Sequence, residues 1–179
     1  MAPTRIATSL DASAIAADIT EGFAGYRAWA PSSWQPPVPG STEIAQFADA
    51  LTRRDVWCLL ALEGDQVIGH VALSRSTRED PGPPPAGTVY VWQLFVRPSW
   101  QGRGIAKQLM QAAVTEATER GYSGMRLWTP QGASRARRFY EREGWTVTGR
   151  TNPNSPFGLP TIEYGCSVLP ANPSATGFS

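Results

Sequence analysis

The chain has 179 residues, of which 41% are hydrophobic and 17% are charged. These values are ordinary for a soluble globular protein, and the length is typical of one domain built around one core. The formal net charge at pH 7 is +1, without a long run of one sign, which argues against a nucleic-acid-binding surface. We find no long apolar stretch and no basic start followed by an apolar segment, so we expect neither a membrane span nor a signal peptide.

The two cysteines, Cys58 and Cys166, both lie in apolar, strand-like runs. A disulfide is therefore not indicated, and we expect a reduced, cytoplasmic setting in which both are core residues. His70 is the only histidine, and one histidine with two distant cysteines does not make a zinc site. We predict no metal.

The N-terminal part of the chain predicts a strand and two helices. A short β-prone run covers Arg5–Leu10, and Asp11 is the expected N-cap of a helix whose apolar residues recur at helical spacing. Gly22 and Gly25 are expected to close this helix. Residues 26–40 are expected to form an irregular loop, and a second helix begins near Thr42.

Three strands are predicted next. Val56–Leu62 and Val67–Ser74 are joined by a hairpin signal at Gly64-Asp65. Residues 75–87 contain a proline cluster and form a loop, because proline removes the donors that a strand needs. Thr88–Val96 is a nearly unbroken apolar run, as expected of a strand that is buried on both faces.

The remaining elements follow a glycine-rich turn. They are a long helix that ends at Gly121, a strand at Met125–Thr129, a short helix at Ala133–Glu143, and strands at Trp145–Thr151 and Thr161–Leu169. This order of elements indicates a mixed α/β layout around one sheet. Residues 170–179 are expected to be a flexible tail.

The turn itself, Gln101–Lys107, contains Gly102 and Gly104 and joins a strand to a helix. The first amides of a helix lack intrahelical partners and lie at the positive end of its dipole, and glycine lets a ligand approach the backbone closely. These properties favour a phosphate or pyrophosphate site. A Walker loop would end in Gly-Lys-Ser/Thr, and a dinucleotide fingerprint would need Gly or Ala at Lys107, so neither is present. On this evidence alone, the two glycines could also make only a tight turn.

The pattern Gln-x-x-Gly-x-Ala at Gln101–Ala106, after Leu94-Phe95-Val96-x-Pro98, resembles the acyl-CoA signature of the GNAT N-acetyltransferases. The segment Ala133–Trp145, with Phe-Tyr on a helix followed by Gly-aromatic, is similar to the second signature of this family. The resemblance implies one α/β domain over residues 1–169, with a central mixed, mostly antiparallel sheet flanked by helices.

The resemblance also implies acetyl-CoA as the co-substrate. Backbone amides of the turn would hold its pyrophosphate, and the preceding strand would bind its pantetheine arm. The implied cofactor-binding residues are Leu94, Phe95, Val96, Gln101, Gly102, Arg103, Gly104, Ile105, Ala106 and Lys107. Tyr140 would be the general acid that protonates, or donates a hydrogen bond to, the departing thiolate. Family members often carry Asn where this chain has Ala133, so backbone contacts would suffice there or CoA would bind less tightly.

The pattern identifies no general base. The positions where many relatives place a glutamate correspond to Thr129 and Gln93, which cannot act as bases. Carboxylates that could approach from loops or the last strand are Glu43, Glu79, Asp80 and Glu163. His70 titrates near neutral pH, but strand histidines are more often structural. A chain of water molecules is at least as good a candidate for removing the proton of the amine.

Trp29, Trp34 and Trp92 either form an aromatic-walled pocket for an amine or anchor proline-rich loops to the core. Both interpretations stay open. By the resemblance, the loops 26–40 and 152–160 border the acceptor site.

The predicted function is the transfer of an acetyl group from acetyl-CoA to a primary amine of a small molecule, by direct attack in a ternary complex. The alternatives are a non-catalytic acyl-CoA sensor with the same fold, acetylation of a peptide N-terminus, and acetylation of aminoacyl-tRNA, which the near-neutral charge disfavours. We expect a small-molecule partner, no nucleic acid and no membrane. The sequence does not specify the oligomeric state, although family members often form homodimers.

Overall fold

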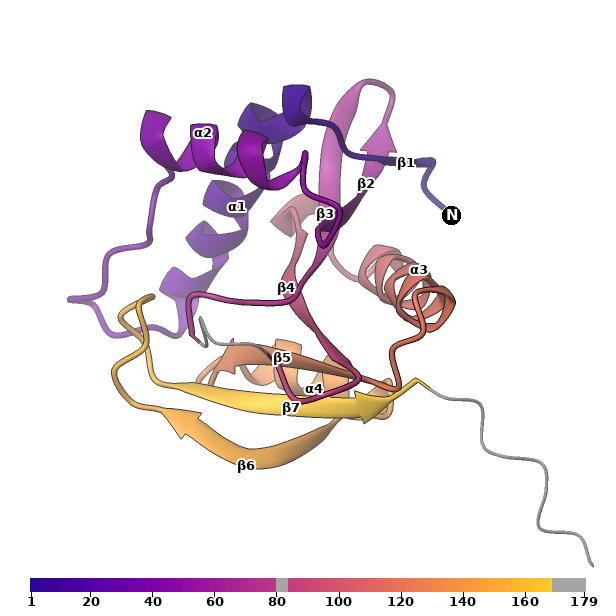
Figure 1. Ribbon diagram of the computed structural model, residues 1–179. Coiled ribbons are helices and arrows are strands. Elements are labelled where there is room, and N and C mark those ends of the chain that lie inside the picture. Colours follow the sequence, from indigo (N-terminus) through magenta and orange to yellow (C-terminus); the bar gives the residue numbers. More distant parts are fainter. Residues whose placement is uncertain (80–83, 169–179) are drawn as a thin grey trace, which may run out of the picture.

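The structure is a computed structural model that describes residues 1–79 and 84–168 (Figure 1). Its strands are β1 (Thr4–Ile6), β2 (Trp57–Glu63), β3 (Gln66–Ser74), β4 (Thr88–Val96), β5 (Gly124–Pro130), β6 (Thr146–Asn152) and β7 (Thr161–Ser167). Its helices are η1 (Ser9–Asp11), α1 (Ala12–Ala24), η2 (Gly25–Ala28), α2 (Ser41–Ala50), η3 (Pro98–Trp100), α3 (Ile105–Glu119) and α4 (Ser134–Arg142). The predicted order of strands and α-helices is confirmed. Asp80, Leu169 and the predicted tail lie outside the described residues.

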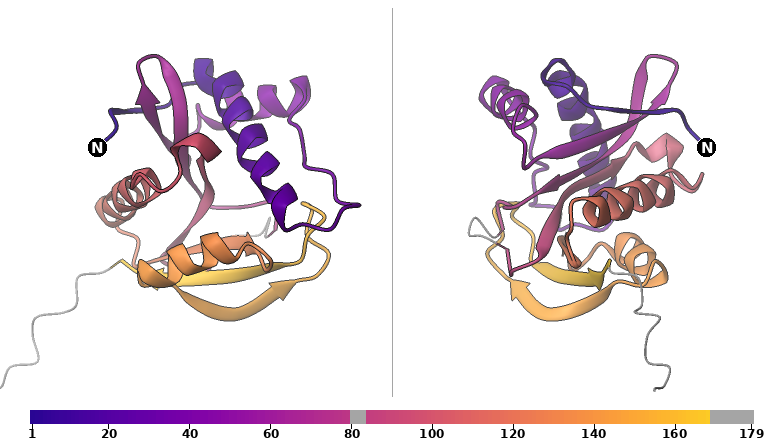
Figure 2. Two further views of the ribbon diagram at one scale, coloured as in Figure 1. Left: turned by 180° about the vertical axis from the view of Figure 1, so that it is seen from behind. Right: turned by 45° about the vertical axis from the view of Figure 1, so that its right-hand side comes forward.

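The strands form one seven-stranded sheet in the order β1-β2-β3-β4-β5-β7-β6. All neighbouring pairs are antiparallel except β4 and β5, which are parallel. The helices α1 and α2 lie on one side of β2, β3 and β4, and α3 lies on the other side (Figures 1 and 2). The prediction of a mixed, mostly antiparallel sheet flanked by helices is confirmed.

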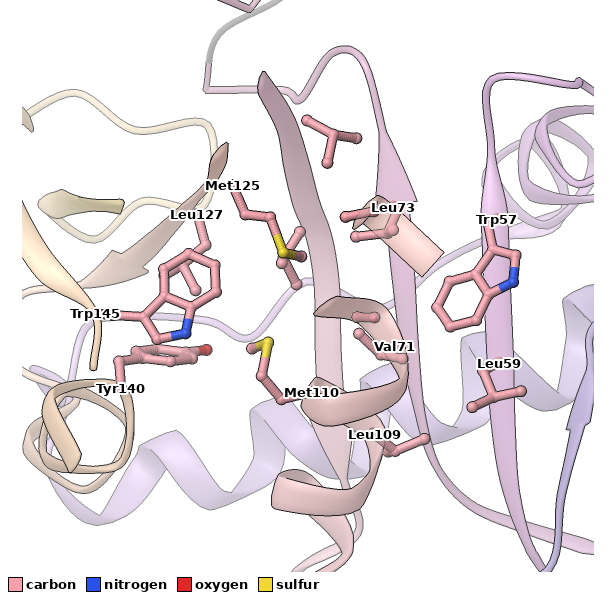
Figure 3. Close-up of a cluster of buried hydrophobic side chains, with 14 of the residues drawn as sticks. Trp57, Leu59, Val71, Leu73, Leu109, Met110, Met125, Leu127, Tyr140 and Trp145 are labelled. Atoms are coloured by element: carbon pink, nitrogen blue, oxygen red, sulfur yellow. The ribbon is translucent and has the colours of Figure 1, made fainter. Parts of the chain in front are cut away.

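Two apolar clusters hold these layers together. One lies between the sheet and α1 and α2. The other lies under α3 and α4, where Leu109 of α3 lies toward Val71 of β3 and Met110 lies toward Tyr140 and Met125 (Figure 3). Because one cluster lies on each face, β2 and β3 are buried along almost their whole length.

The feature of the fold that matters most for the site is the separation of β4 from β5. The two strands pair only at Thr88↔Gly124, Val89↔Met125 and Tyr90↔Arg126. Beyond this point β5 continues to pair with β7, while β4 pairs only with β3 as far as Val96. One edge of β4 is therefore open from Val91 onward.

This opening corrects one expectation about β4. The strand is buried at Val89–Val91, but Trp92–Phe95 are only half-buried, so it is not covered on both faces throughout. The register with β3 also shifts here, because Leu73 pairs with Val91 and Ala72 pairs with Gln93. Trp92 is left over as a bulge, and bulges of this kind bend a strand next to functional sites.

The start of α1 agrees with the prediction in position but not in its hydrogen bonds. Asp11 is the N-cap residue of α1, as predicted, but its side chain makes no capping hydrogen bond to the helix. Its carboxylate instead accepts hydrogen bonds from the Arg5 guanidinium at 2.6 and 2.8 Å and from the Thr8 amide at 2.8 Å. Of the two glycines expected to close the helix, Gly25 is its C-cap, whereas Gly22 lies inside it, where the ring of Phe95 leaves no room for a Cβ atom.

The Asp11–Arg5 pair predicts a dependence of stability on pH. The hydrogen bonds from Arg5 lower the pKa of the Asp11 carboxyl from 3.8 to about 2. Its stabilising contribution is therefore complete above pH 4 and is lost as the pH falls towards about 2. Arg5 is 47% exposed and screened by water, so we expect the contribution to be about 1 kcal/mol. Urea unfolding of the wild type and of Asp11→Asn checks this. The difference between their free energies of unfolding should shrink as the pH falls from about 5 to about 2.

Candidate active site

A pocket with a cavity volume of about 170 Å³ opens where β4 and β5 separate. Aromatic side chains form a large part of its walls, and these residues are Phe23, Tyr26, Phe47, Trp92, Phe95, Trp128, Tyr140 and Phe157. They come from both sides of the sheet, because the gap between the two strands runs through it. Among the described residues, the charged side chains that line the pocket are Glu43 and Arg78. The pocket is thus mostly apolar with few polar groups, as is usual for sites that bind small molecules.

The open edge of β4 carries part of the predicted cofactor site. Leu94 and Phe95 line the pocket, whereas Val96 is buried in the core cluster under α3. The carbonyl oxygen of Val96 accepts a hydrogen bond from the side-chain amide of Gln101 at 3.0 Å. This bond ties the glycine turn to the end of β4.

The turn has the backbone conformation that its glycines predict. Gly102 and Gly104 have φ angles of +81° and +82°, and a residue with a Cβ atom adopts this region only with strain. Gly104 is the N-cap of α3, so the amides that follow it lack intrahelical partners. No atom lies within 4 Å of where a Cβ atom of Gly104 would be, which leaves the backbone accessible there.

Basic side chains surround this turn. The Arg103 guanidinium stacks on the ring of Trp100 at 4.5 Å, and an Arg135 nitrogen lies 3.8 Å from where a Cβ atom of Gly102 would be. The Lys107 ammonium lies 3.7 Å from a carboxylate oxygen of Glu143. Unpaired amides together with these cations fit a pyrophosphate. The turn residues themselves do not line the pocket, and Ile105 points into the core.

The conformation of Gly104 gives a direct test of this anion site. We expect Gly104→Ala to lower acetyl-CoA affinity by about tenfold, because the strained turn no longer holds its amides in place. Gly149→Ala is the matched control, since Gly149 has a φ of +89° and equally free surroundings on β6. Both variants should lose about 1 kcal/mol of stability, and only the first should weaken binding. Calorimetric titration with acetyl-CoA checks the affinities, and equal affinities would show that the turn does not bind the co-substrate.

Tyr140 lines the pocket from α4 and is only 8% exposed. Its ring lies against that of Trp145, with ring centres 6.1 Å apart (Figure 3). The ring centre of Tyr164 lies 5.9 Å from that of Tyr140. Burial raises the pKa of the Tyr140 phenol far above its usual value near 10. The phenol therefore keeps its proton and is available as a hydrogen-bond donor.

Tyr26, which follows α1, is a second phenol of the pocket that sequence reasoning missed. Burial raises its pKa to about 12, so this phenol also keeps its proton, and it lines the same pocket as Tyr140. No motif includes Tyr26. The only available signal was its place at the start of the loop that the family resemblance assigns to the acceptor site.

The three tryptophans have different surroundings. Trp92 lines the pocket and contacts Phe47 edge to face at 5.9 Å. Trp34 does not line it, and its indole nitrogen donates a hydrogen bond to the carbonyl oxygen of Phe157 at 2.8 Å. Trp29 does not line it either, and its ring covers Gly132 closely enough to leave no room for a Cβ atom. Trp29 and Trp34 thus join the loop 26–40 to neighbouring segments, and Trp92 is the one that a ligand in the pocket would meet.

Two of the four carboxylates considered as bases, Glu79 and Glu163, are engaged elsewhere. Glu79 bonds Asn152 at 2.7 Å and the hydroxyl of Ser155, which connects the loops before β4 and β7. Glu163 is fully buried and bonds Arg126 and Arg150, both at 2.9 Å, away from the pocket lining.

Glu43, in contrast, lines the pocket, where one carboxylate oxygen accepts a hydrogen bond from the Gly40 amide at 3.0 Å. Thr129 and Gln93 line it as well. His70 is fully buried and contacts the side chain of Gln93, so it does not reach the pocket itself.

The cysteines do not have the properties of nucleophiles. Burial raises the pKa of the Cys58 thiol to about 12 and that of the Cys166 thiol to about 11. Neither residue lines the pocket. A covalent route through an acylated cysteine is therefore disfavoured.

The described part of the chain contains no helix that is long and apolar enough to cross a bilayer. In residues 1–79 and 84–168, no group of three or more His, Cys, Asp or Glu side chains is arranged to hold a metal ion.

The model of the acetyltransferase (GNAT) family matches residues 23–145, and the chain belongs to this family. By sequence, it is similar to an uncharacterized N-acetyltransferase of Mycobacterium tuberculosis, with 28% identity over 112 residues that cover 63% of this chain and 67% of the relative. The family match identifies the chain as a GNAT N-acetyltransferase, a class of enzyme that uses acetyl-CoA.

Solved structures give the same fold at low sequence identity. An N-acetyltransferase from Staphylococcus aureus Mu50 superposes with a TM-score of 0.75 at 20% identity, covering 94% of this chain and 99% of that one. The PaiA N-acetyltransferase from Thermoplasma acidophilum, solved in complex with coenzyme A, gives a TM-score of 0.67 at 15% identity, covering 93% and 99%.

Proposed function

We propose that the protein transfers the acetyl group of acetyl-CoA to the primary amine of a small molecule, with both substrates bound at once. The observation that carries this proposal is the pocket between β4 and β5, because the open edge of β4, the buried phenol of Tyr140 and the aromatic walls meet there. Its aromatic walls favour an acceptor with an apolar body. One carboxylate at the pocket, Glu43, would attract the ammonium group of an incoming amine.

Acetyl-CoA would enter from the side of α3 and α4. Its pyrophosphate would bind the amides of the glycine turn and the nearby Arg103, Lys107 and Arg135. Its pantetheine arm would extend along the open edge of β4 at Leu94 and Phe95, forming hydrogen bonds like an added strand. Ala133, where relatives often carry Asn, is buried and joined to neighbouring turns by backbone hydrogen bonds, so contacts of its side chain are not needed to shape this region.

In the reaction, the nitrogen of the neutral amine attacks the thioester carbonyl carbon. The new C–N bond forms, the C–S bond breaks, and the sulfur leaves as a thiolate. Backbone amides on the open edge of β4 would polarise the carbonyl oxygen as negative charge develops on it. The amine loses its proton to water, directly or through Glu43, and the thiolate finally takes up one proton to become free CoA.

Tyr140 would stabilise the departing thiolate. Because burial raises the pKa of this phenol above 10, whereas alkyl thiols ionise near 8.5, complete proton transfer from the phenol to the sulfur is unfavourable. A hydrogen bond from the phenol to the thiolate is favourable, and it is stronger in the transition state than in the bound thioester. The role that fits this geometry is therefore hydrogen-bond donation rather than full protonation.

The experiment that tests this function measures thiol release from acetyl-CoA with a panel of amines, with mass spectrometry of the acetylated product. The panel contains amino acids, polyamines, arylalkylamines and short peptides with free N-termini. We expect stoichiometric thiol release and acetylation with at least one small amine. Binding of acetyl-CoA without acetylation of any amine would contradict the proposal and support a non-catalytic sensor, and acetylation of peptides alone would move the acceptor to a protein N-terminus.

A further inference from the structure

A buried row of polar side chains leads from α1 through β3 to the pocket. Asp18 and His70 are both fully buried, and the Nδ1 atom of His70 lies 2.5 Å from a carboxylate oxygen of Asp18. The other ring nitrogen, Nε2, lies 3.1 Å from the side-chain carbonyl oxygen of Gln93. Phe95 stacks on the imidazole ring at 5.7 Å and fixes its plane. Gln93 is half-buried and lines the pocket, so it is the end of the row that a ligand can touch.

Each ring nitrogen of His70 faces an oxygen atom, Nδ1 that of the Asp18 carboxylate and Nε2 that of the Gln93 amide. In this arrangement of acceptor oxygens, both ring nitrogens donate a hydrogen bond. The second oxygen of Asp18 lies 3.7 Å from Arg97, and Arg97 bonds Glu21 at 2.7 Å. With a proton on each ring nitrogen, His70 is a cation. The two cations His70 and Arg97 then balance the carboxylates of Asp18 and Glu21. The nearby Cys58 is a neutral thiol, because burial raises its pKa to about 12.

This arrangement determines which end of the Gln93 amide faces the pocket. Its oxygen is held by His70, and the amide nitrogen, which has two donors, is the end left for a ligand. Arg78 is a second donor group at the same pocket. Gln93 also lies beside Leu94 on the open stretch of β4, next to where the acetyl group is proposed to lie. An amine that carries an oxygen next to its amino group would place that oxygen against these donors.

We propose that Gln93 is a specificity-determining residue, oriented by His70 and Asp18, whose amide nitrogen binds an oxygen of the acceptor. This proposal rests on the proposed function and names its substrate class, amines with a carboxylate or carbonyl oxygen next to the amino group. His70 and Asp18 act through Gln93 and are positioning residues. They do not accept the proton of the amine.

The orientation of Gln93 can be read from the ring nitrogens of His70, without any assay of activity. Because His70 is the only histidine, protein labelled with ¹⁵N-histidine and produced without a histidine tag gives one unambiguous set of ring signals. We expect both nitrogens of the full chain to give the signals of protonated nitrogens at neutral pH. An unprotonated Nε2 would overturn the proposal, because Gln93 would then donate to His70 and present its oxygen to the pocket.

The substrate class is tested with phenylalanine, phenylalaninamide and phenethylamine, which share an aromatic body and differ in the oxygen. We expect kcat/KM to be about tenfold higher for at least one of the first two, since one hydrogen bond is worth about this factor. The Gln93→Met variant should abolish this preference, mainly through KM. Gln111→Met, on the exposed side of α3, is the control that should keep it.

The outcomes separate this proposal from the proposed function. Equal or better turnover of phenethylamine, or a preference that persists in Gln93→Met, would overturn the role of Gln93. Acetylation of a polyamine such as spermidine but of none of the three probes would overturn the substrate class and leave the acetyltransferase function intact. Absence of turnover with every amine would refute the function, and the ring signals of His70 would still decide the orientation of Gln93.

Discussion

Replacing Tyr140 by phenylalanine is expected to lower kcat by about 100-fold, with little change in the KM for acetyl-CoA. The substitution removes only the hydroxyl group and leaves the packing against Trp145 and Tyr164 in place. Because a hydrogen bond to the thiolate forms as the C–S bond breaks, its loss acts on the transition state and not on binding. Steady-state thiol release at saturating acetyl-CoA measures the effect. Because the pKa of Tyr140 is raised, we also expect that ionisation of this phenol does not lower the kcat of the wild type at pH values up to about 10.

Tyr164→Phe is the matched control. Tyr164 is another buried tyrosine, but its hydroxyl bonds Arg137 and Glu141 at 3.0 and 2.8 Å, and it does not line the pocket. This variant should lose about 1 kcal/mol of stability and keep its kcat. If Tyr140→Phe and Tyr164→Phe had the same kcat, Tyr140 would have no part in thiolate departure.

The largest effect on stability is expected for Asp18→Ala, which should lower the free energy of unfolding by about 3–5 kcal/mol. Asp18 is fully buried and is the anion between His70 and Arg97. Its removal leaves cationic groups in a low-dielectric environment without their partner, and this costs more than the loss of the interaction itself. Urea unfolding followed by tryptophan fluorescence measures the difference.

Glu21→Ala is the control for this prediction. Glu21 also carries a carboxylate on α1 and bonds Arg97 at 2.7 Å, but its side chain is 47% exposed. Exposed ion pairs contribute at most about 1 kcal/mol, so this variant should remain close to the wild type. A loss for Asp18→Ala no larger than that for Glu21→Ala would mean that the buried cluster is not held together by the Asp18 charge.

The order of the strands and helices could be predicted from the sequence because local signals mark each element. Thr88–Val96 is predicted and observed with the same bounds, since a proline loop precedes it and Pro98 follows it. The separation of β4 from β5 could not be predicted in this way. It depends on which strand pairs with which beyond Tyr90, and hydrophobic periodicity does not specify pairing.

The residues of the site could likewise be predicted only where a local motif contains them. The glycine turn and Tyr140 belong to local motifs, so the sequence points to them. The contact of Gln93 with His70 joins two strands, and the contact of His70 with Asp18 joins a strand to a distant helix. Asp18 did carry one signal, since it lies on the apolar face of α1 next to Ile19, and a carboxylate there requires a buried cation.

The measurement that tests the central claim most directly is thermal unfolding with and without acetyl-CoA, with free adenosine as the control ligand. A ligand present at about 100 times its dissociation constant adds about 2.7 kcal/mol of stability. For a chain of this size, that corresponds to a rise in Tm of about 5–10 °C. We expect this rise with acetyl-CoA and none with adenosine, because the proposed anion site at the glycine turn requires the pyrophosphate that adenosine lacks. An unchanged Tm at millimolar acetyl-CoA would contradict the assignment of the turn and the pocket to an acetyl-CoA-dependent transferase.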